Sequence, residues 1–220
     1  MTAHANTDSE RQTETMDRIL TAAELEFAER GFDGVGMKAI SVRAGVSQGL
    51  LHYHFGTKDR LYEEVIGRRS TKINEERRAL LSRVDFTRED ALDHVLEAMF
   101  RPPLGPSGGE AAYARIFSGL IIGREREQAL VKKFYDPTAR LFVDAFGKIL
   151  HAQDPSTAGL CYVMSLGVLV SFIGRDGRVE SLMNRADEME TEERLSNLIL
   201  FARGGVEAIL DRSVKEAATS

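Results

Sequence analysis

Cysteine is nearly absent from this sequence, and so are long apolar runs. Cys161 is the only cysteine, which excludes a disulfide framework and a thiolate metal cluster and favours a reducing compartment. The N-terminal residues MTAHANTDSERQTET are polar, so we expect no signal peptide. The longest apolar run, Leu160–Ile173, is interrupted by Ser165, Gly167 and Ser171 and falls short of the roughly 18 residues of a membrane span. We therefore expect a soluble, cytoplasmic protein with no membrane partner.

The sequence also lacks the short motifs of metal- and cofactor-dependent enzymes. No histidine follows a glutamate by three residues, so the signature of di-iron helical bundles is missing. HExxH, CxxC and a phosphate-binding glycine loop are missing as well. We therefore expect no catalytic residue, no metal and no cofactor. An all-α enzyme and an all-α small-molecule binding protein that does not contact DNA are the alternatives to the function argued below, and a test of DNA binding or substrate turnover would separate them.

Helical periodicity fills most of the chain. The composition, 43% hydrophobic and 29% charged, is typical of a globular protein, and we find neither a repeat nor a convincing strand. The predicted fold class is all-α, with residues 1–13 as a mobile arm and PPLGPSGG (Pro102–Gly109) as the most pronounced loop. Helices are predicted over residues 15–30, 37–44, 48–54, 58–84, 87–101, 110–123, 125–151 with a bend at Pro137, 155–173 and 191–211.

The stretch Ala44–Tyr62 has the pattern of two short helices joined by a glycine turn. Gly45 suits the left-handed backbone of that turn, and Ser47 is a favourable N-cap for the second helix. That helix can bury Leu51 and Phe55 on one face, which leaves polar and aromatic side chains on the other. Two short helices joined in this way are the outline of a helix-turn-helix DNA-binding unit.

Four groups of residues in and before this stretch resemble one family. They are IL, AA and FAERGF within Ile19–Phe32, AGVS at Ala44–Ser47, G, L and YHF within Gly49–Phe55, and TKDRLY at Thr57–Tyr62. Together, over about residues 16–65, they resemble the TetR/AcrR family of transcriptional regulators. The resemblance implies a three-helix helix-turn-helix DNA-binding domain at 14–62 and a larger helical effector-binding and dimerisation domain at 63–220. It also implies a dimeric repressor that binds a palindromic operator and is released by a small, hydrophobic effector.

The resemblance further implies which residues contact the operator. The second short helix of such proteins enters the major groove, and Gln48, Gly49 and Leu50 match its base-reading positions. Leu50 stands where threonine is frequent, so an apolar contact, such as one with a thymine methyl, is expected there. The full set of predicted DNA contacts, several of them to phosphates, is Met37, Lys38, Ser47, Gln48, Gly49, Leu50, His52, Tyr53, His54 and Lys58.

The charge distribution favours a phosphate-facing surface in this region, although the net charge of −5 alone does not suggest nucleic acid. Lys58 places positive charge at the positive end of a helix dipole, which is unfavourable. A bound phosphate would offset this cost, and Asp59 is the alternative. Residues 35–60 hold that single acid against four basic residues, Lys38, Arg43, Lys58 and Arg60.

The second half of the chain carries most of the large apolar side chains, whose default role is the core. The resemblance implies that the fifth to eighth helices enclose an apolar effector pocket. Its predicted lining is Met99, Phe100, Tyr113, Phe117, Ile121, Phe134, Phe142 and Tyr162. Polar candidates near such a pocket are His94, Arg115, His151 and Cys161. Arg77, in contrast, is expected on a solvated face of the fourth helix.

The last two helices have the composition of an interface. Leu160–Ile173 is apolar on nearly every face. Glycines at 204 and 205 inside the last helix cost about 1 kcal/mol each relative to alanine, which a close helix crossing would explain; the alternative is that the helix ends at Gly204. In the family, the last two helices form a four-helix dimer bundle. A homodimer is therefore predicted through Leu160, Met164, Gly167, Ser171, Leu195, Leu198, Ala202 and Gly205.

Overall fold

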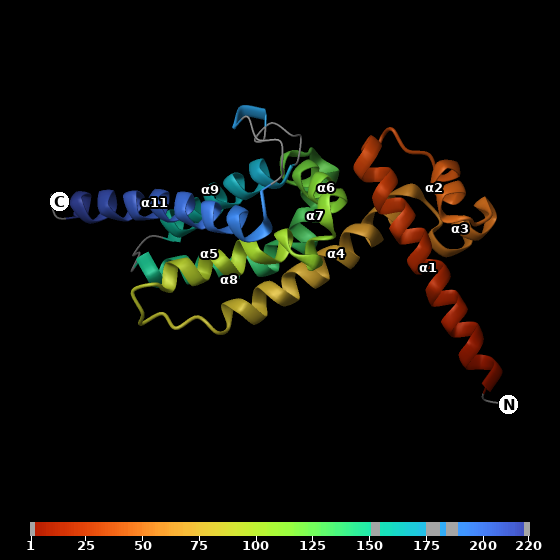
Figure 1. Ribbon diagram of the computed structural model, residues 1–220, viewed down its shortest axis with the longest axis horizontal. Coiled ribbons are helices and arrows are strands. Elements are labelled where there is room, and N and C mark those ends of the chain that lie inside the picture. The colour runs from red at the N-terminus through yellow and green to blue at the C-terminus, as the bar shows by residue number, and fades with distance from the viewer. Residues whose placement is uncertain (1–2, 151–154, 175–180, 184–188, 218–220) are drawn as a thin grey trace. The chain divides into compact units, whose positions relative to one another are not determined.

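The computed structural model describes residues 3–150, 155–174, 181–183 and 189–217. The chain divides into two compact units, Met1–Arg69 (unit one) and Ser70–Ser220 (unit two). Every regular element in the described residues is a helix (Figure 1), which confirms the all-α prediction. The division falls after Arg69, inside a helix, and therefore later than the predicted domain boundary at residue 62.

Unit one consists of α1 (Ala3–Arg30), α2 (Met37–Ala44), α3 (Gln48–Phe55) and the first half of α4 (Lys58–Leu81). The predicted bounds of the two short helices hold to within one residue. The segment predicted as a mobile arm is helical from Ala3 onward, so the first helix begins earlier than the predicted residue 15. No glycine or proline interrupts Ala3–Arg30, so nothing in the local sequence stops the helix before Gly31.

The core of unit one is built by apolar side chains that all its helices contribute. Phe27 of α1 packs edge to face on Tyr62 of α4, with ring centres 4.8 Å apart. Two side chains of α3, Leu51 and Phe55, and Ile40 of α2 lie in the same core, each at most 2% exposed. Because α3 is only eight residues long, this burial, more than its own helix propensity, holds it in place.

Unit two contains the second half of α4 and the helices that follow it. The helices are α5 (Ala91–Leu104), the 3-10 turn η1 (Pro106–Gly108), α6 (Glu110–Ile122), α7 (Glu125–Phe134), α8 (Asp136–Leu150), α9 (Pro155–Ile173) and α11 (Thr191–Ala217). Helix α9 packs against α6, α8 and α11, and α11 also packs against α5 (Figure 1).

Two predictions about unit two are wrong, both at prolines. Pro102 and Pro103 lie in the last turn of α5 instead of in a loop, because both are buried and packing outweighs their low helix propensity. The single bent helix predicted over residues 125–151 is two helices, separated at Tyr135. Pro137 then occupies the first turn of α8, where a proline costs no hydrogen bond.

Helix α9 is the one described helix that is long and apolar enough to cross a membrane. The stretch Ser156–Ile173 has a mean hydropathy of 1.8, and 33% of it is buried inside the protein. A core helix in a helical domain has the same composition, so this is weak evidence for a membrane span. Helix α11 continues through Gly204 and Gly205 to Ala217, so the alternative of a break at Gly204 is wrong.

Candidate DNA-binding surface, effector core and subunit interface

The turn between α2 and α3 has the predicted geometry. Gly45 adopts φ 65° and ψ 37°, the left-handed conformation that a side chain would penalise. The Oγ of Ser47 accepts a hydrogen bond of 3.1 Å from the backbone N–H of Leu50 and thereby caps α3. These local interactions fix the start of α3 relative to α2.

Helix α3 presents one face to solvent. Tyr53 is 78% exposed and Leu50 38% exposed, whereas Leu51 is fully buried. At Gly49 an added Cβ would meet only the Oγ of Ser47, at 4.0 Å, so the fold leaves room for a side chain there. Of the predicted DNA contacts, Lys38, Ser47, Gln48, Gly49, Leu50, His52 and Tyr53 are exposed, and Met37, His54 and Lys58 are half-buried.

His52 has a second task at the end of α3. Its Nδ1 lies 2.8 Å from the carbonyl oxygen of Gly56. Since a carbonyl can only accept, Nδ1 must carry the proton, which leaves Nε2 as the nitrogen available to an external group. Beside it, the rings of Tyr53 and His54 meet edge to face at 5.2 Å. His52 therefore joins the exposed face of α3 to the turn that follows it.

Lys58 is held inside unit one by interactions that the sequence did not reveal. Its Nζ donates to the carbonyl oxygens of Phe32 at 2.9 Å and Val35 at 3.0 Å, and it lies 4.2 Å from the centre of the Phe32 ring. The predicted phosphate contact through this ammonium therefore competes with internal partners. The backbone N–H groups of Lys58 and Asp59 belong to the first turn of α4 and have no acceptor within the helix, so they provide the other means of holding a phosphate.

Arg43 does not belong to the basic surface on which we had counted it. Its Nη1 and Nη2 donate to the two carboxylate oxygens of Glu29, each at 2.8 Å, and its Nε lies 2.9 Å from Glu26. The hydrogen bond to Glu29 raises the pKa of Arg43. This network ties α2 to α1 and neutralises the charge of Arg43, so Lys38 and Arg60 are the exposed cations of residues 35–60 outside the network.

Most of the predicted effector residues form the core of unit two. Met99, Phe100, Tyr113, Phe117 and Phe142 are each at most 2% exposed. Tyr162 is 9% exposed, and Ile121 and Phe134 are half-buried. The hydroxyls of Tyr113 and Tyr135 lie 2.6 Å apart, joined by a hydrogen bond inside this core.

The polar candidates fall elsewhere. His94 and Arg115 are exposed, Cys161 is buried, and His151 lies outside the described residues. Burial raises the pKa of the Cys161 thiol. Among the residues that the structure describes, no group of histidine, cysteine and acidic side chains is arranged to hold a metal ion.

Arg77 is the polar residue of this core that sequence reasoning missed. We expected it on a solvated face of α4, but it is 3% exposed, and its Nε and Nη2 donate to the carbonyl oxygen of Met99 at 3.1 and 2.9 Å. Its neighbour Arg78 is exposed as predicted. The available signal was spacing: Arg77 follows the apolar Ile73 by four residues and so lies on the same helix face, whereas Arg78 does not.

The predicted interface residues divide between two faces. Leu160, Met164, Gly167, Ser171 and Gly205 are exposed, as an interface requires. Leu195, Leu198 and Ala202 are buried inside the protomer, where α11 packs on α5 and α9, so their place in an interface stays a prediction.

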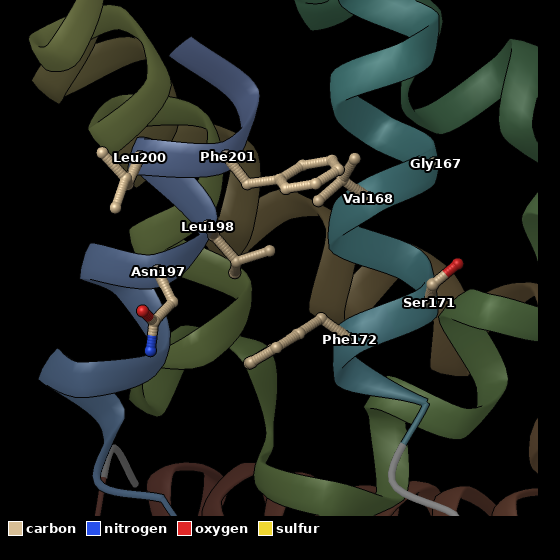
Figure 2. Close-up of a pocket in the computed structure, with 8 residues that line it drawn as sticks. All are labelled: Gly167, Val168, Ser171, Phe172, Asn197, Leu198, Leu200 and Phe201. Carbon is tan, nitrogen blue, oxygen red and sulfur yellow. The ribbon is translucent and has the colours of Figure 1, made fainter. Parts of the chain in front are cut away.

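Other residues of α11 occupy the outward face. Leu200 is 70% and Phe201 71% exposed. A groove of about 670 Å³ lies between α9 and α11, and Figure 2 shows Phe201 and Phe172 directed into it, with Phe201 next to Val168. Its lining residues are Gly167, Val168, Ser171, Phe172, Asn197, Leu198, Leu200 and Phe201.

Comparisons with known proteins match both units. The model of bacterial regulatory proteins of the tetR family matches residues 19–65, and the model of the tetracyclin repressor-like C-terminal domain matches residues 95–205. The chain is 40% identical over 55 residues to the HTH-type transcriptional repressor BepR of Brucella suis, covering 25% of this chain and 26% of that protein. It is 38% identical over 77 residues to the HTH-type transcriptional repressor Rv3405c of Mycobacterium tuberculosis, covering 33% of this chain and 41% of that protein.

Each of these two matches therefore spans less than half of the relative's length. A TetR-like transcriptional regulator from Rhodococcus sp. RHA1 has a similar structure, with a TM-score of 0.64 at 20% identity over 88% of this chain and 96% of that one. At that level of identity the likeness shows the fold alone.

Proposed function

Because the chain belongs to the TetR family of bacterial regulatory proteins, we propose that it is a dimeric, ligand-responsive transcriptional repressor that acts on DNA in the cytoplasm. The observation that carries the proposal is the exposed face of α3. Gln48, Gly49 and Leu50 are open to solvent at the start of a short helix whose other face is anchored by Leu51 and Phe55. A rigidly held short helix with an open N-terminal turn is the geometry that major-groove recognition requires.

The DNA contacts divide into two kinds. Gln48, Gly49 and Leu50 face the bases, where an amide can pair with adenine and a leucine can contact a thymine methyl. Lys38 and the first turn of α4 bind phosphates and set the position of the helix on the duplex. The remaining predicted contacts, which lie around α3 and at the start of α2, are Met37, Ser47, His52, Tyr53 and His54.

The second copy of the chain packs on the outward faces of α9 and α11. Met164, Leu200 and Phe201 are each more than half exposed and form an apolar surface. At Gly167 and Gly205 an added Cβ would meet nothing within 4 Å in the protomer, so nothing within the protomer requires glycine there. The close approach of a helix from the second copy explains why glycine stands at these two positions. In the resulting two-fold dimer, the two copies of α3 lie about 34–36 Å apart on a palindromic operator.

Effector release follows from the continuity of α4. This helix begins in unit one at Lys58 and ends in unit two at Leu81, so a displacement of its second half is transmitted along a rigid element. An effector that binds unit two more tightly in one position of α4 than in the other shifts the population toward that position. Binding of the effector then changes the free energy of DNA binding by the same amount as binding of DNA changes the free energy of effector binding.

Selection of bound duplexes from random DNA tests the proposal. We expect an inverted repeat to be enriched, and we expect Gln48→Ala to change the preferred bases in its half-sites more than the overall affinity. If no sequence is enriched and the protein binds DNA as weakly as a neutral protein does, DNA recognition is contradicted. That outcome would favour an all-α binding protein or enzyme. A uniform loss of affinity in Gln48→Ala would remove that residue from base contact.

A further inference from the structure

A buried cation in unit two has no acidic partner among the residues that the structure describes. Arg77 of α4 is 3% exposed, and the acceptor recorded for it is a single carbonyl oxygen, that of Met99. A guanidinium has five N–H donors. Burying a charge costs several kcal/mol unless it is paired and its donors are satisfied.

Two less buried arginines of the protein have carboxylate partners. Arg69 donates to both oxygens of Glu24, at 2.7 and 2.8 Å, and Arg43 does so with Glu29. For Arg77, no carboxylate among the described residues lies within ion-pair distance. The charged or polar groups that act on it are the hydroxyls of Tyr162, Tyr135 and Tyr113, and burial lowers its pKa.

A second polar group with unused capacity lies one turn away. Asn74 precedes Arg77 by three residues on α4 and therefore shares its face. It is 4% exposed, and its Nδ2 donates to the carbonyl of Phe134 at 2.8 Å. Its Oδ1 is buried and has no hydrogen-bond partner in the described part of the protein. Buried polar groups are normally paired, so two incompletely satisfied neighbours on one helix face indicate a ligand.

The tyrosines that act on Arg77 belong to an aromatic core, in which the ring centres of Phe142 and Tyr162 lie 6.4 Å apart. Phe100, Phe117 and Phe142 are each at most 2% exposed, and the ring centres of Phe117 and Tyr135 lie 5.1 Å apart. This core therefore offers one positive charge, one hydrogen-bond acceptor and hydrophobic walls.

We infer that Arg77 is the anion-binding residue of the effector site and that the effector is a carboxylic acid with an apolar or aromatic body. The inference rests on the proposed function, because it assigns an effector class to the regulator. The carboxylate supplies a counter-charge that the described residues do not provide, and a hydroxyl or N–H group beside it would also satisfy Oδ1 of Asn74. Arg77 is on α4, so pairing of this charge acts directly on the helix that continues into unit one.

The experiment compares carboxylates with neutral analogues of the same shape. Binding of phenylacetate, mandelate and decanoate to the full-length protein is measured by calorimetry, beside phenylethanol and decanol. We expect at least one carboxylate to bind about tenfold or more tightly than its alcohol, in line with a charge-assisted hydrogen bond. Equal affinities, or no binding of any of the three carboxylates, would overturn the inference.

Two variants separate ligand binding from a structural role. In Arg77→Met the carboxylate preference should disappear, while resistance to urea is unchanged or higher, because replacing an unbalanced buried charge by an apolar side chain of similar volume is often stabilising. Arg140→Met, on an exposed position of α8, is the matched control and should retain the preference. A retained preference in Arg77→Met, or a marked loss of urea resistance in that variant without any carboxylate effect, assigns Arg77 to the fold alone.

DNA binding is measured separately on the selected duplex. If the wild-type protein binds no DNA, the proposed function fails whatever the ligand results are. If it binds DNA and shows no carboxylate preference, only the inference about Arg77 fails.

Discussion

Lys58 donates a hydrogen bond of 2.9 Å to the carbonyl of Phe32, and its ammonium lies 4.2 Å from the centre of the Phe32 ring. One side chain thus ties the first turn of α4 to the segment between α1 and α2. The contact is charge-assisted on one side and a cation–π interaction on the other. It makes Lys58 a residue that positions the DNA-binding unit from within.

Substitution of Lys58 by methionine should therefore reduce stability as well as DNA binding. Two hydrogen bonds from a charged donor are lost and two part-buried carbonyls lose their partner, so we expect the free energy of unfolding of the DNA-binding unit to fall by about 1–3 kcal/mol. Urea denaturation measures this change.

Lys38→Met is the matched control for Lys58→Met. Lys38 is exposed on α2, so its loss should leave stability unchanged, weaken binding to all duplexes and reduce the salt slope of the affinity by about one. If Lys58→Met is as stable as the wild type and changes only the salt slope, the ammonium contacts phosphate and the internal contacts contribute little.

Gly49→Ala should separate folding from DNA recognition. The space around Gly49 accepts a Cβ, and alanine is the better helix former, so stability should be unchanged or higher by up to about 1 kcal/mol. The added methyl nevertheless lies on the face that approaches the bases, and specific binding should weaken. The comparison requires thermal denaturation and DNA titration of the same protein, and undiminished specific affinity would show that α3 does not approach the bases at this residue.

Phe201→Glu should dissociate the proposed dimer. A carboxylate placed at the centre of an apolar interface must be desolvated without a partner, so we expect the dimer dissociation constant to rise by about a hundredfold or more. Sedimentation equilibrium measures this constant. Ile122→Glu, at an 81% exposed residue of α6, should leave it unchanged. Equal dissociation constants for Phe201→Glu and Ile122→Glu would place the interface on another surface.

Alkaline pH should destabilise unit two through Tyr135. Burial raises the pKa of Tyr135 well above its ordinary value, and the hydrogen bond between the hydroxyls of Tyr135 and Tyr113 offsets part of this. The folded protein therefore keeps a proton that the unfolded chain releases near pH ~10. The resulting stability is complete below that pH and is lost as pH rises further, because the unfolded state then binds fewer protons.

The measurement is urea denaturation about one pH unit below and one above the ordinary tyrosine pKa of ~10. Between these two pH values, Tyr135→Phe should lose less stability than the wild type. Tyr53→Phe, at a residue of α3 that is 78% exposed, should lose as much as the wild type. An unaltered alkaline loss in Tyr135→Phe would assign the effect to other groups, such as Tyr162, whose pKa burial also raises.

Much of unit one could be predicted because its signals are local. The left-handed turn at Gly45 and the cap at Ser47 depend on residues within three or four positions, and so do the bounds of α2 and α3. The N-terminal extension of α1 and the helical ending at Pro102 and Pro103 were missed. The polar N-terminal residues predicted a mobile arm, but the helix continues through them. The two prolines predicted a loop, but their burial keeps them in the last turn of α5.

The sequence by itself determined most of the helical segments, where the DNA-binding helix begins and which family the chain resembles. These properties follow from backbone preferences, helix periodicity and caps, all of which act over a few residues. Only the tertiary structure decided the partners of the charged residues. It tied Lys58 to the carbonyl of Phe32 and Arg43 to Glu29. It also faced Leu195 to the core and Phe201 outward, and it buried Arg77 while leaving Arg78 exposed. The direction of a side chain is fixed by what packs around its helix, and that packing brings together residues far apart in the chain.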